Sequence, residues 1–195
     1  MSSLYLVRHC EYDNPRNILP GRLPVELSEK GKKQARKLTE YFKDKSIAKI
    51  HSSAVLRCKQ TSEIISSNAI PIVYDKRLLE IHSAYQGIAR EPNDPLKEYE
   101  YFYGHIPELG GESLYDIYTR MASFFEELLL DLHENVIVCS HGDPLYMAYY
   151  WFTKKPLPSI NEVSDPNLSD YQEKASVREV VVEQSGHTLR PILQF

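Results

Sequence analysis

Two short apolar runs, each closed abruptly by polar residues, constrain the fold more than any other feature of the sequence. Leu4–Val7 is followed by Arg8-His9, and Val136–Cys139 is followed by Ser140-His141-Gly142. Apolar runs of this length, bounded by polar residues, are typical of buried strands. Amphipathic segments typical of helices lie between such runs, so strands and helices alternate along the chain. This alternation predicts a layered α/β fold.

The intervening segments predict the other elements of this fold. Ser28 is a good N-cap for the helix that follows it, and Ser52-Ser53 are candidate caps for a helix near 55–67 that carries Arg57 in its first turn. Further strands are expected at 47–51 and 72–74, helices after Gly110-Gly111 and at 143–153, and a hairpin of strands 177–183 and 189–193 around Ser185-Gly186. We expect residues 1–195 to form one domain, a three-layer α/β/α sandwich around a mostly parallel mixed sheet.

Composition excludes several classes of function. The formal net charge is −4 and no basic block is present, which argues against a nucleic-acid partner. No apolar stretch has membrane-spanning length, and the N-terminus does not resemble a signal peptide. Three cysteines, at positions 10, 58 and 139, form no CxxC pair, so we expect a reducing, cytoplasmic compartment rather than a disulfide framework. Nothing in the sequence indicates an oligomeric state.

Polar residues that follow the predicted strands are suited to phosphoryl chemistry. In a parallel sheet His9 and His141 emerge at the same edge, where Arg57 and Glu80 also follow predicted elements. Arginines bind phosphoryl oxygens with forked donors, and a helix N-terminus adds favourable dipoles. A histidine with one unprotonated nitrogen attacks phosphorus, and a carboxyl group protonates the leaving oxygen. We therefore expect a small phosphorylated substrate.

The ordered set of motifs resembles the histidine phosphatase superfamily, in the branch that contains the cofactor-dependent phosphoglycerate mutases and their phosphatase relatives. The matching pieces are Leu6-Val7-Arg8-His9, Leu27-Ser28-Glu29-Lys30-Gly31, Ser52 to Thr61, Leu79-Glu80, Gly110-Gly111-Glu112-Ser113 and Val138 to Gly142. The resemblance implies a phosphoglycerate mutase-like fold and a metal-independent reaction without a cofactor.

The resemblance also implies a role for each matching residue. His9 would be the nucleophile that forms a phosphohistidine, and Glu80 would be the acid and base. Arg8, Arg57 and His141 would hold the phosphoryl oxygens. Asn14 would be the loop asparagine that contacts phosphate, but its spacing from Arg8 is one residue short of the family pattern, so Asn17 competes for this role.

One residue departs from the family pattern. Glycine usually follows the catalytic histidine, and here the residue is Cys10. Because glycine permits positive φ, either the loop differs in this chain or that backbone conformation is not required. Each cysteine adjoins a motif, and we interpret all three primarily as small buried hydrophobes, with an oxidant-sensitive site as the alternative.

The segment after the catalytic glutamate favours a phosphatase over a mutase. Mutases of this branch place an arginine directly after that glutamate, whereas Ile81 follows Glu80 here. Residues 81–111 offer only Arg90 and Lys97 against several acids, so a bisphosphate cofactor would be poorly held. We also expect some tyrosines of this segment to contact substrate. Mutase-type phosphoryl transfer remains the alternative.

Two further alternatives remain. His9-Cys10 through Arg16 matches the HCx5R signature of cysteine-dependent phosphatases, although Glu11 and Asp13 would then place carboxylates where a phosphate dianion must bind. The chain could also be a catalytically weak module that binds phosphorylated ligands, since a fold does not fix a function.

Overall fold

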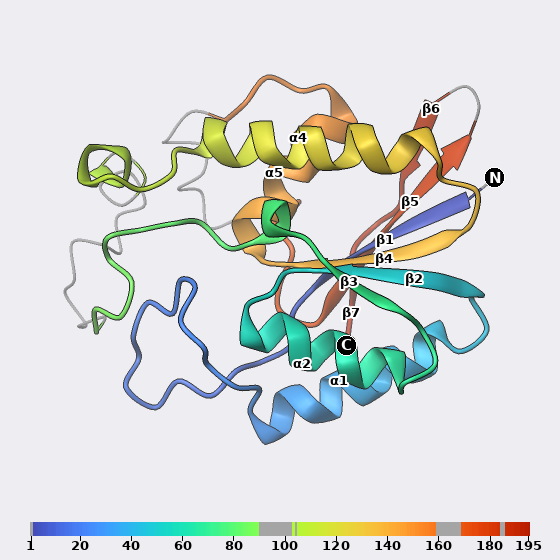
Figure 1. Cartoon of the computed structure of the whole chain (residues 1–195), viewed down its shortest axis with the longest axis horizontal. Coiled ribbons are helices and arrows are strands. Elements are labelled where there is room, and N and C mark those ends of the chain that lie inside the picture. Colours follow the sequence, from blue (N-terminus) through green and yellow to red (C-terminus); the bar gives the residue numbers. More distant parts are fainter. Residues whose placement is uncertain (1, 90–102, 104, 159–168, 184–185) are drawn as a thin grey trace.

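The computed structural model describes residues 2–89, 103, 105–158, 169–183 and 186–195. Seven strands, four α-helices and two short 3-10 helices make up these residues (Figure 1). In chain order they are β1 (Ser2–Arg8), α1 (Glu29–Phe42), β2 (Ile47–Ser52), α2 (Leu56–Ser66), β3 (Ile72–Tyr74), η1 (Lys76–Leu78), η3 (Pro107–Leu109), α4 (Leu114–Leu130), β4 (Asn135–Ser140), α5 (Gly142–Thr153), β5 (Ser176–Glu183), β6 (Gly186–Leu189) and β7 (Leu193–Gln194).

The strands form one mixed sheet in the order β3-β2-β4-β1-β5-β6, with β7 also paired to β5. The strands β3, β2, β4 and β1 run parallel to one another, whereas β5 lies antiparallel to β1 and β6 lies antiparallel to β5. The register of β1 against β4 places Arg8 opposite Ser140. The residues that follow these two central strands therefore emerge side by side.

Helices cover both faces of the sheet and confirm the predicted three-layer sandwich. In Figure 1, α1 and α2 lie on one face and α4 and α5 on the other. Side chains of β1 alternate between the two layers: Leu4 and Leu6 pack with α4 and α5, and Tyr5 and Val7 pack with α1 and α2. Burial on both faces explains why this strand is an unbroken apolar run. No helix in the described part of the chain is long and apolar enough to cross a bilayer.

The N-terminus of α1 anchors the loop that leaves β1. Ser28 caps the helix as predicted, and its side chain accepts a hydrogen bond from the Gly31 amide at 3.1 Å. The Ser28 amide donates to the Glu11 carbonyl at 3.1 Å. A Cβ added to Gly31 would overlap that same carbonyl oxygen. The helix thus approaches the loop as closely as a glycine allows, and fixes the backbone two residues after His9.

Two local predictions were wrong in detail. The hairpin exists, but its second strand, β6, begins at Gly186 and ends at Leu189, and Leu193 belongs to β7. Ser52 and Ser53 do not cap α2, whose N-cap is Val55 without a side-chain cap. The Ser53 hydroxyl instead accepts from the Val55 amide at 3.3 Å and binds His141.

The contact between α1 and this loop generates a test of stability. Glycine to alanine in a helix ordinarily stabilises a protein by about 1 kcal/mol. We expect Gly31→Ala to destabilise this one by about 2 kcal/mol, because the new methyl group overlaps the Glu11 carbonyl. Urea denaturation measures the difference, with Lys33→Ala on the exposed face of α1 as the control. Stabilisation by Gly31→Ala would contradict the packing described.

Candidate active site

The ends of β1 and β4 bring the two predicted histidines together. Their ring centroids lie 5.2 Å apart, and the His9 and His141 side chains are 1% and 0% exposed. Arg57, from the first turn of α2, is also 1% exposed and lies between them. Glu80 follows η1, and its carboxyl group lies close to Arg57 and His141.

Hydrogen bonds fix the tautomer of His9. Its Nδ1 donates to the Cys10 carbonyl at 2.8 Å, and its Nε2 accepts from Arg57 Nε at 3.1 Å. Burial, together with the nearby charges of Arg57 and Arg8, lowers the pKa of His9 well below its ordinary value. The imidazole is therefore neutral at physiological pH, with its lone pair on the nitrogen that faces the arginine.

His141 has the complementary arrangement. Its Nδ1 accepts from Arg57 Nη2 at 2.9 Å, so its Nε2 carries the proton and donates to Ser53 Oγ at 2.8 Å. Burial and the charge of Arg57 lower the pKa of this histidine as well. Arg57 thus bridges both rings, and its Nη2 also donates to the Gly21 carbonyl at 2.8 Å.

Both arginines retain an unpaired donor. Arg57 Nη1 and Arg8 Nε are buried and have no hydrogen-bond partner within the described residues. Arg8 is held by the Gln172 carbonyl at 2.6 Å and stacks on the Tyr171 ring at 5.2 Å. Leaving buried charged donors unpaired costs free energy, which an anion bound between them would recover.

Glu80 lies where its carboxyl group faces both the arginine and the second histidine. Its Oε2 is 3.6 Å from Arg57 Nη2 and 3.6 Å from His141 Nδ1, and its Oε1 accepts from the Ile81 amide at 3.0 Å. Burial, followed by the charge of Asp143, raises the pKa of Glu80 to about 7, although Arg57 opposes this shift. This carboxyl group can hold a proton at neutral pH and release it.

A hydrogen-bonded cluster fixes the backbone of Glu80. Arg22 Nε donates to the Glu80 carbonyl at 2.8 Å, and Arg22 Nη2 pairs with Glu112 at 2.8 Å. Glu112 also pairs with Arg120 at 2.9 Å and accepts from the His82 amide at 2.8 Å. Glu112 therefore connects α4 to the Glu80 loop, while Asp116 and Ser113 form the capping box of α4.

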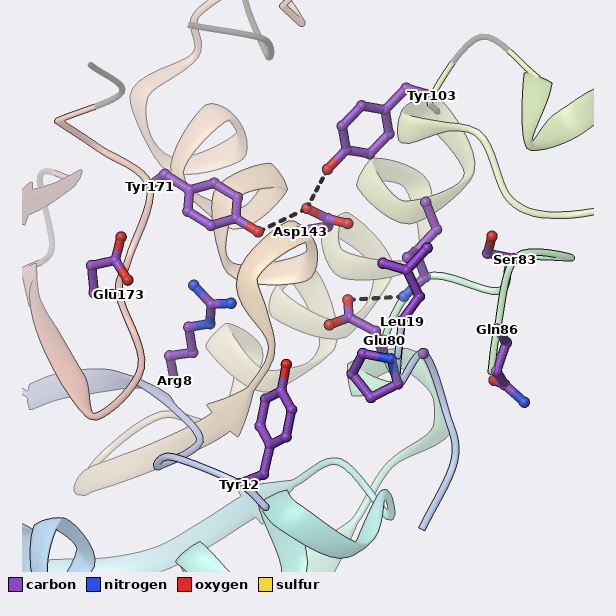
Figure 2. A pocket seen from close by; sticks show the side chains of 13 residues that line it. Arg8, Tyr12, Leu19, Glu80, Ser83, Gln86, Tyr103, Asp143, Tyr171 and Glu173 are labelled. Carbon is purple, nitrogen blue, oxygen red and sulfur yellow. Dashed lines mark hydrogen bonds between the residues drawn. The ribbon is translucent and has the colours of Figure 1, made fainter. Parts of the chain in front are cut away.

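A cavity of about 310 Å³ opens beside this group. Figure 2 shows Arg8 and Glu80 on its wall, with the tyrosine hydroxyls directed toward its interior. The cavity is not lined by His9, Arg57 or His141 themselves. These residues contact three lining residues instead, namely Tyr12, Gly21 and Glu80. The lining residues are Arg8, Tyr12, Leu19, Pro20, Gly21, Glu80, Ile81, Ser83, Gln86, Tyr103, Asp143, Tyr171 and Glu173. This volume suits a small metabolite.

The structure does not bring every predicted residue to this cavity. Both ends of the Asn14 amide bind the backbone of Ile18, at 2.9 and 3.0 Å, and Asn14 does not line the cavity. Asn17, its competitor, is exposed and has positive φ. Of the tyrosines in 81–111, Tyr103 lines the cavity, and those at 99 and 101 lie outside the described residues, as do Arg90 and Lys97.

Cys10 is buried in the core and not directed at the cavity. It packs in the apolar cluster beneath α1 and α2, and it is not among the residues with positive φ. Its amide donates to Thr61 Oγ1 at 3.1 Å, and Thr61 donates to the Arg57 carbonyl at 2.8 Å. The backbone after His9 therefore accepts a cysteine without strain. Cys58 and Cys139 are likewise free and buried.

Sequence reasoning missed Asp143, Tyr171, Gln172 and Ser53. Asp143 stands two residues after His141, a position that could have signalled its place at the N-terminus of α5. Tyr171 and Gln172 lie in a stretch without periodicity, so the sequence held no signal for them. A Cβ on Gly142 would overlap the Tyr171 hydroxyl, which shows how closely this segment covers the site.

Among the described residues, no group of three or more histidine, cysteine, aspartate or glutamate side chains is arranged to hold a metal ion. The expected absence of a metal from the reaction stays a prediction.

Comparisons with known proteins identify the relatives of this chain. The model of the histidine phosphatase superfamily (branch 1) matches residues 4–190. Phosphoserine phosphatase 1 of Hydrogenobacter thermophilus is 33% identical over 160 residues, which cover 76% of this chain and 75% of that protein. A probable phosphoglycerate mutase GpmB of Photorhabdus laumondii is 31% identical over 156 residues, which cover 73% and 70% of the two chains.

Solved structures show the same fold. Bacillus stearothermophilus YhfR superposes with a TM-score of 0.81 and 25% identity, covering 98% of this chain and 96% of that one. A mycobacterial glucosyl-3-phosphoglycerate phosphatase in complex with VO3 gives a TM-score of 0.79 at 24% identity, covering 97% of both chains.

The pKa of Glu80 predicts a pH-dependent stability. A carboxyl group whose pKa is raised in the folded state stabilises the fold while it is neutral, and this stability is lost as the pH rises from about 4.5 through about 7. The difference between the pKa of Glu80 in the folded state and in the unfolded state corresponds to about 3 kcal/mol in the free energy of unfolding. We expect Glu80→Gln to unfold like the wild type at pH 4.5 and to be more stable at pH 8.

Thermal denaturation across this pH range measures the effect. Glu126→Gln, at an exposed position of α4, is the control and should follow the wild type throughout. A Glu80→Gln protein that gains no stability at pH 8 would refute the raised pKa.

Proposed function

The chain belongs to branch 1 of the histidine phosphatase superfamily, and we propose that it is a metal-independent phosphatase that hydrolyses small phosphomonoesters through a phosphohistidine on His9. One observation carries the proposal: a neutral imidazole nitrogen accepts a hydrogen bond from Arg57 and lies within the electrostatic influence of Arg8, and each of these two guanidinium groups retains one buried, unpaired nitrogen. Such an arrangement binds a phosphoryl dianion and presents a nucleophile to its phosphorus.

In the first step, substrate binding exchanges the partners of Arg57. Its hydrogen bonds to His9 Nε2 and the Gly21 carbonyl are replaced by bonds to phosphoryl oxygens, which frees the Nε2 lone pair. His9 Nε2 forms the bond to phosphorus while the ester P–O bond breaks, and Glu80 gives its proton to the departing oxygen. Arg8, Arg57 and His141 offset the charge of the transferring group.

In the second step, the ionised Glu80 takes a proton from water, whose oxygen attacks the phosphohistidine. The P–N bond breaks, phosphate leaves, and Glu80 again holds a proton for the next cycle. A pKa of about 7 suits a group that must give and take a proton in turn. The Cys10 carbonyl holds the Nδ1 proton of His9 in both steps, which keeps the reactive nitrogen directed at phosphorus.

The walls of the cavity support a phosphatase over a mutase. Beyond the phosphate-binding groups, the acidic residues Asp143 and Glu173 line the cavity, and a bisphosphate cofactor would lie against them. A relative at 33% identity is named a phosphoserine phosphatase. The small size of the cavity supports a small phosphorylated metabolite as substrate.

The position of Cys10 argues against a cysteine nucleophile. Its side chain is fully buried among apolar residues, and burial raises its pKa to about 12. A thiol in this state supplies almost no thiolate at neutral pH. Arg16, the arginine of the HCx5R pattern, is exposed. Three free, buried cysteines also support the expected reducing, cytoplasmic compartment.

Trapping of the covalent intermediate tests the proposal. Quenching with an alkaline denaturant, in which the P–N bond survives, after brief incubation with 32P-labelled phosphomonoester should recover label on the wild-type protein and on Cys10→Ser, and none on His9→Ala. The amount of label recovered on the wild-type protein should be the same when a metal chelator is present. Label on His9→Ala, or its loss in Cys10→Ser, would overturn the nucleophile. Binding of phosphate without hydrolysis of any ester would instead favour a binding module.

Leaving-group dependence tests Glu80. An alkyl oxygen needs a proton to leave, whereas p-nitrophenolate does not. We therefore expect Glu80→Gln to lower kcat/KM by about 100-fold or more for an alkyl phosphate and far less for p-nitrophenyl phosphate. In the wild type, kcat/KM for the alkyl ester should fall above about pH 7, as the carboxyl group ionises. Equal losses on both esters would exclude Glu80 as the acid.

A further inference from the structure

Asp143 is a buried carboxylate on the wall of the cavity that the proposed reaction does not use. It lies in the first turn of α5, and the residue is 7% exposed. Its Oδ1 accepts hydrogen bonds from the hydroxyls of Tyr103 at 2.8 Å and Tyr171 at 3.0 Å. Two tyrosines from distant parts of the chain thus hold this side chain in one orientation (Figure 2).

The second oxygen of Asp143 has no such partner. In Figure 2 both dashed lines end on one oxygen, and the other is directed toward the side of the cavity that holds Glu80. No hydrogen bond joins Oδ2 to any residue in the described part of the chain. Oδ2 is not among the buried polar atoms that lack a partner, and Asp143 lines the cavity, so this oxygen is accessible to a ligand there. Burial of the residue raises the pKa of Asp143 despite the two tyrosines and Arg8, and a ligand that donates a hydrogen bond to Oδ2 would favour the charged carboxylate.

Charge selects which kind of donor fits. Three carboxyl groups line the cavity, from Glu80, Asp143 and Glu173, and Arg8 is the one basic side chain among the described lining residues. Once Arg8 and Arg57 hold the phosphoryl group and Glu80 holds its proton, Asp143 and Glu173 are the remaining ionisable carboxyl groups among the described lining residues. A leaving group with a carboxylate would face like charges, whereas an ammonium group would be paired. The ring of Tyr103 adds a surface suited to a cation.

We propose that Asp143, held by Tyr103 and Tyr171, recognises an ammonium group on the leaving-group side of the substrate, so that the preferred substrates are small aminoalkyl phosphomonoesters. This inference rests on the proposed phosphatase function and specifies the substrate class of the same site. Asp143 is a specificity-determining residue in this proposal, and Glu80 remains the acid.

Competitive inhibition by non-hydrolysable phosphonates separates recognition from chemistry. Three probes share a spacer of three methylene groups: 3-aminopropylphosphonate, butylphosphonate and 4-phosphonobutanoate, which end in an ammonium, a methyl and a carboxylate group. Each is titrated against hydrolysis of p-nitrophenyl phosphate. We expect the aminophosphonate to inhibit the wild type at a concentration about tenfold or more below that of butylphosphonate, and the carboxylate to be weakest.

Variants assign the preference to its residue. Asp143→Asn keeps the shape of the side chain and removes its charge, so the ratio of the two inhibition constants should fall to about one, while butylphosphonate binds as in the wild type. Tyr103→Phe removes one hydrogen bond that orients the carboxylate, and should reduce the ratio only in part. Glu173→Ser leaves Asp143 in place and should keep most of the preference.

The outcomes distinguish the two proposals. Equal inhibition by the aminophosphonate and butylphosphonate, or a preference that survives in Asp143→Asn, would overturn the ammonium site and leave the phosphatase intact. Tighter binding of the carboxylate would also overturn it. Failure to hydrolyse p-nitrophenyl phosphate would contradict the phosphatase itself, and direct calorimetric titration of the same phosphonates would then still test the Asp143 site.

Discussion

Burial beside two guanidinium groups reverses the usual order in which a histidine and a glutamate lose their protons. A free carboxyl group ionises well before an imidazolium does. Here burial and the cationic neighbours lower the pKa of His9, while burial and the charge of Asp143 raise the pKa of Glu80 to about 7. A nucleophile with an unprotonated nitrogen and an acid with a proton therefore coexist at neutral pH. The proposed chemistry depends on this state, which would be rare for the same two side chains in water.

Backbone geometry maintains that electrostatic arrangement. The parallel pairing of β1 with β4 sets the two histidines side by side, and α2 inserts Arg57 between them. Thr61 then links the Arg57 carbonyl to the amide after His9. This link holds the backbones that carry the nucleophile and its cationic partner in a fixed relation to each other. Arg8 and Glu80 are held by other segments of the chain. The Gln172 carbonyl accepts a hydrogen bond from Arg8, and Arg22 donates one to the Glu80 carbonyl.

Prediction from sequence succeeded where periodicity and strand order determine position. The β1 and β4 runs and the first turn of α2 indicated His9, His141 and Arg57, because a parallel sheet collects the residues after its strands at one edge. It failed where a loop returns to the site from a distance. Tyr171 and Gln172 lie in an aperiodic stretch, yet a hydroxyl and a carbonyl there contact Asp143 and Arg8. Asn14 shows the converse. Its position in the loop predicted a contact with phosphate, but both polar atoms of its side-chain amide form hydrogen bonds with the backbone of Ile18. Local spacing carries no information about such contacts.

Binding of a phosphoryl dianion would change the balance that the free site maintains. Negative charge between Arg8 and Arg57 weakens their effect on the neighbouring groups, and so favours protonation of both His9 and Glu80. For Glu80 this is productive, since the acid must hold its proton until the ester bond breaks. For His9 it would be harmful if the ring became cationic. Burial, the largest cause of its lowered pKa, does not depend on the arginines and persists when substrate fills the cavity. The apolar packing around β1 therefore contributes to function as well as to stability, because it keeps the nucleophile neutral when the compensating cations are engaged by substrate.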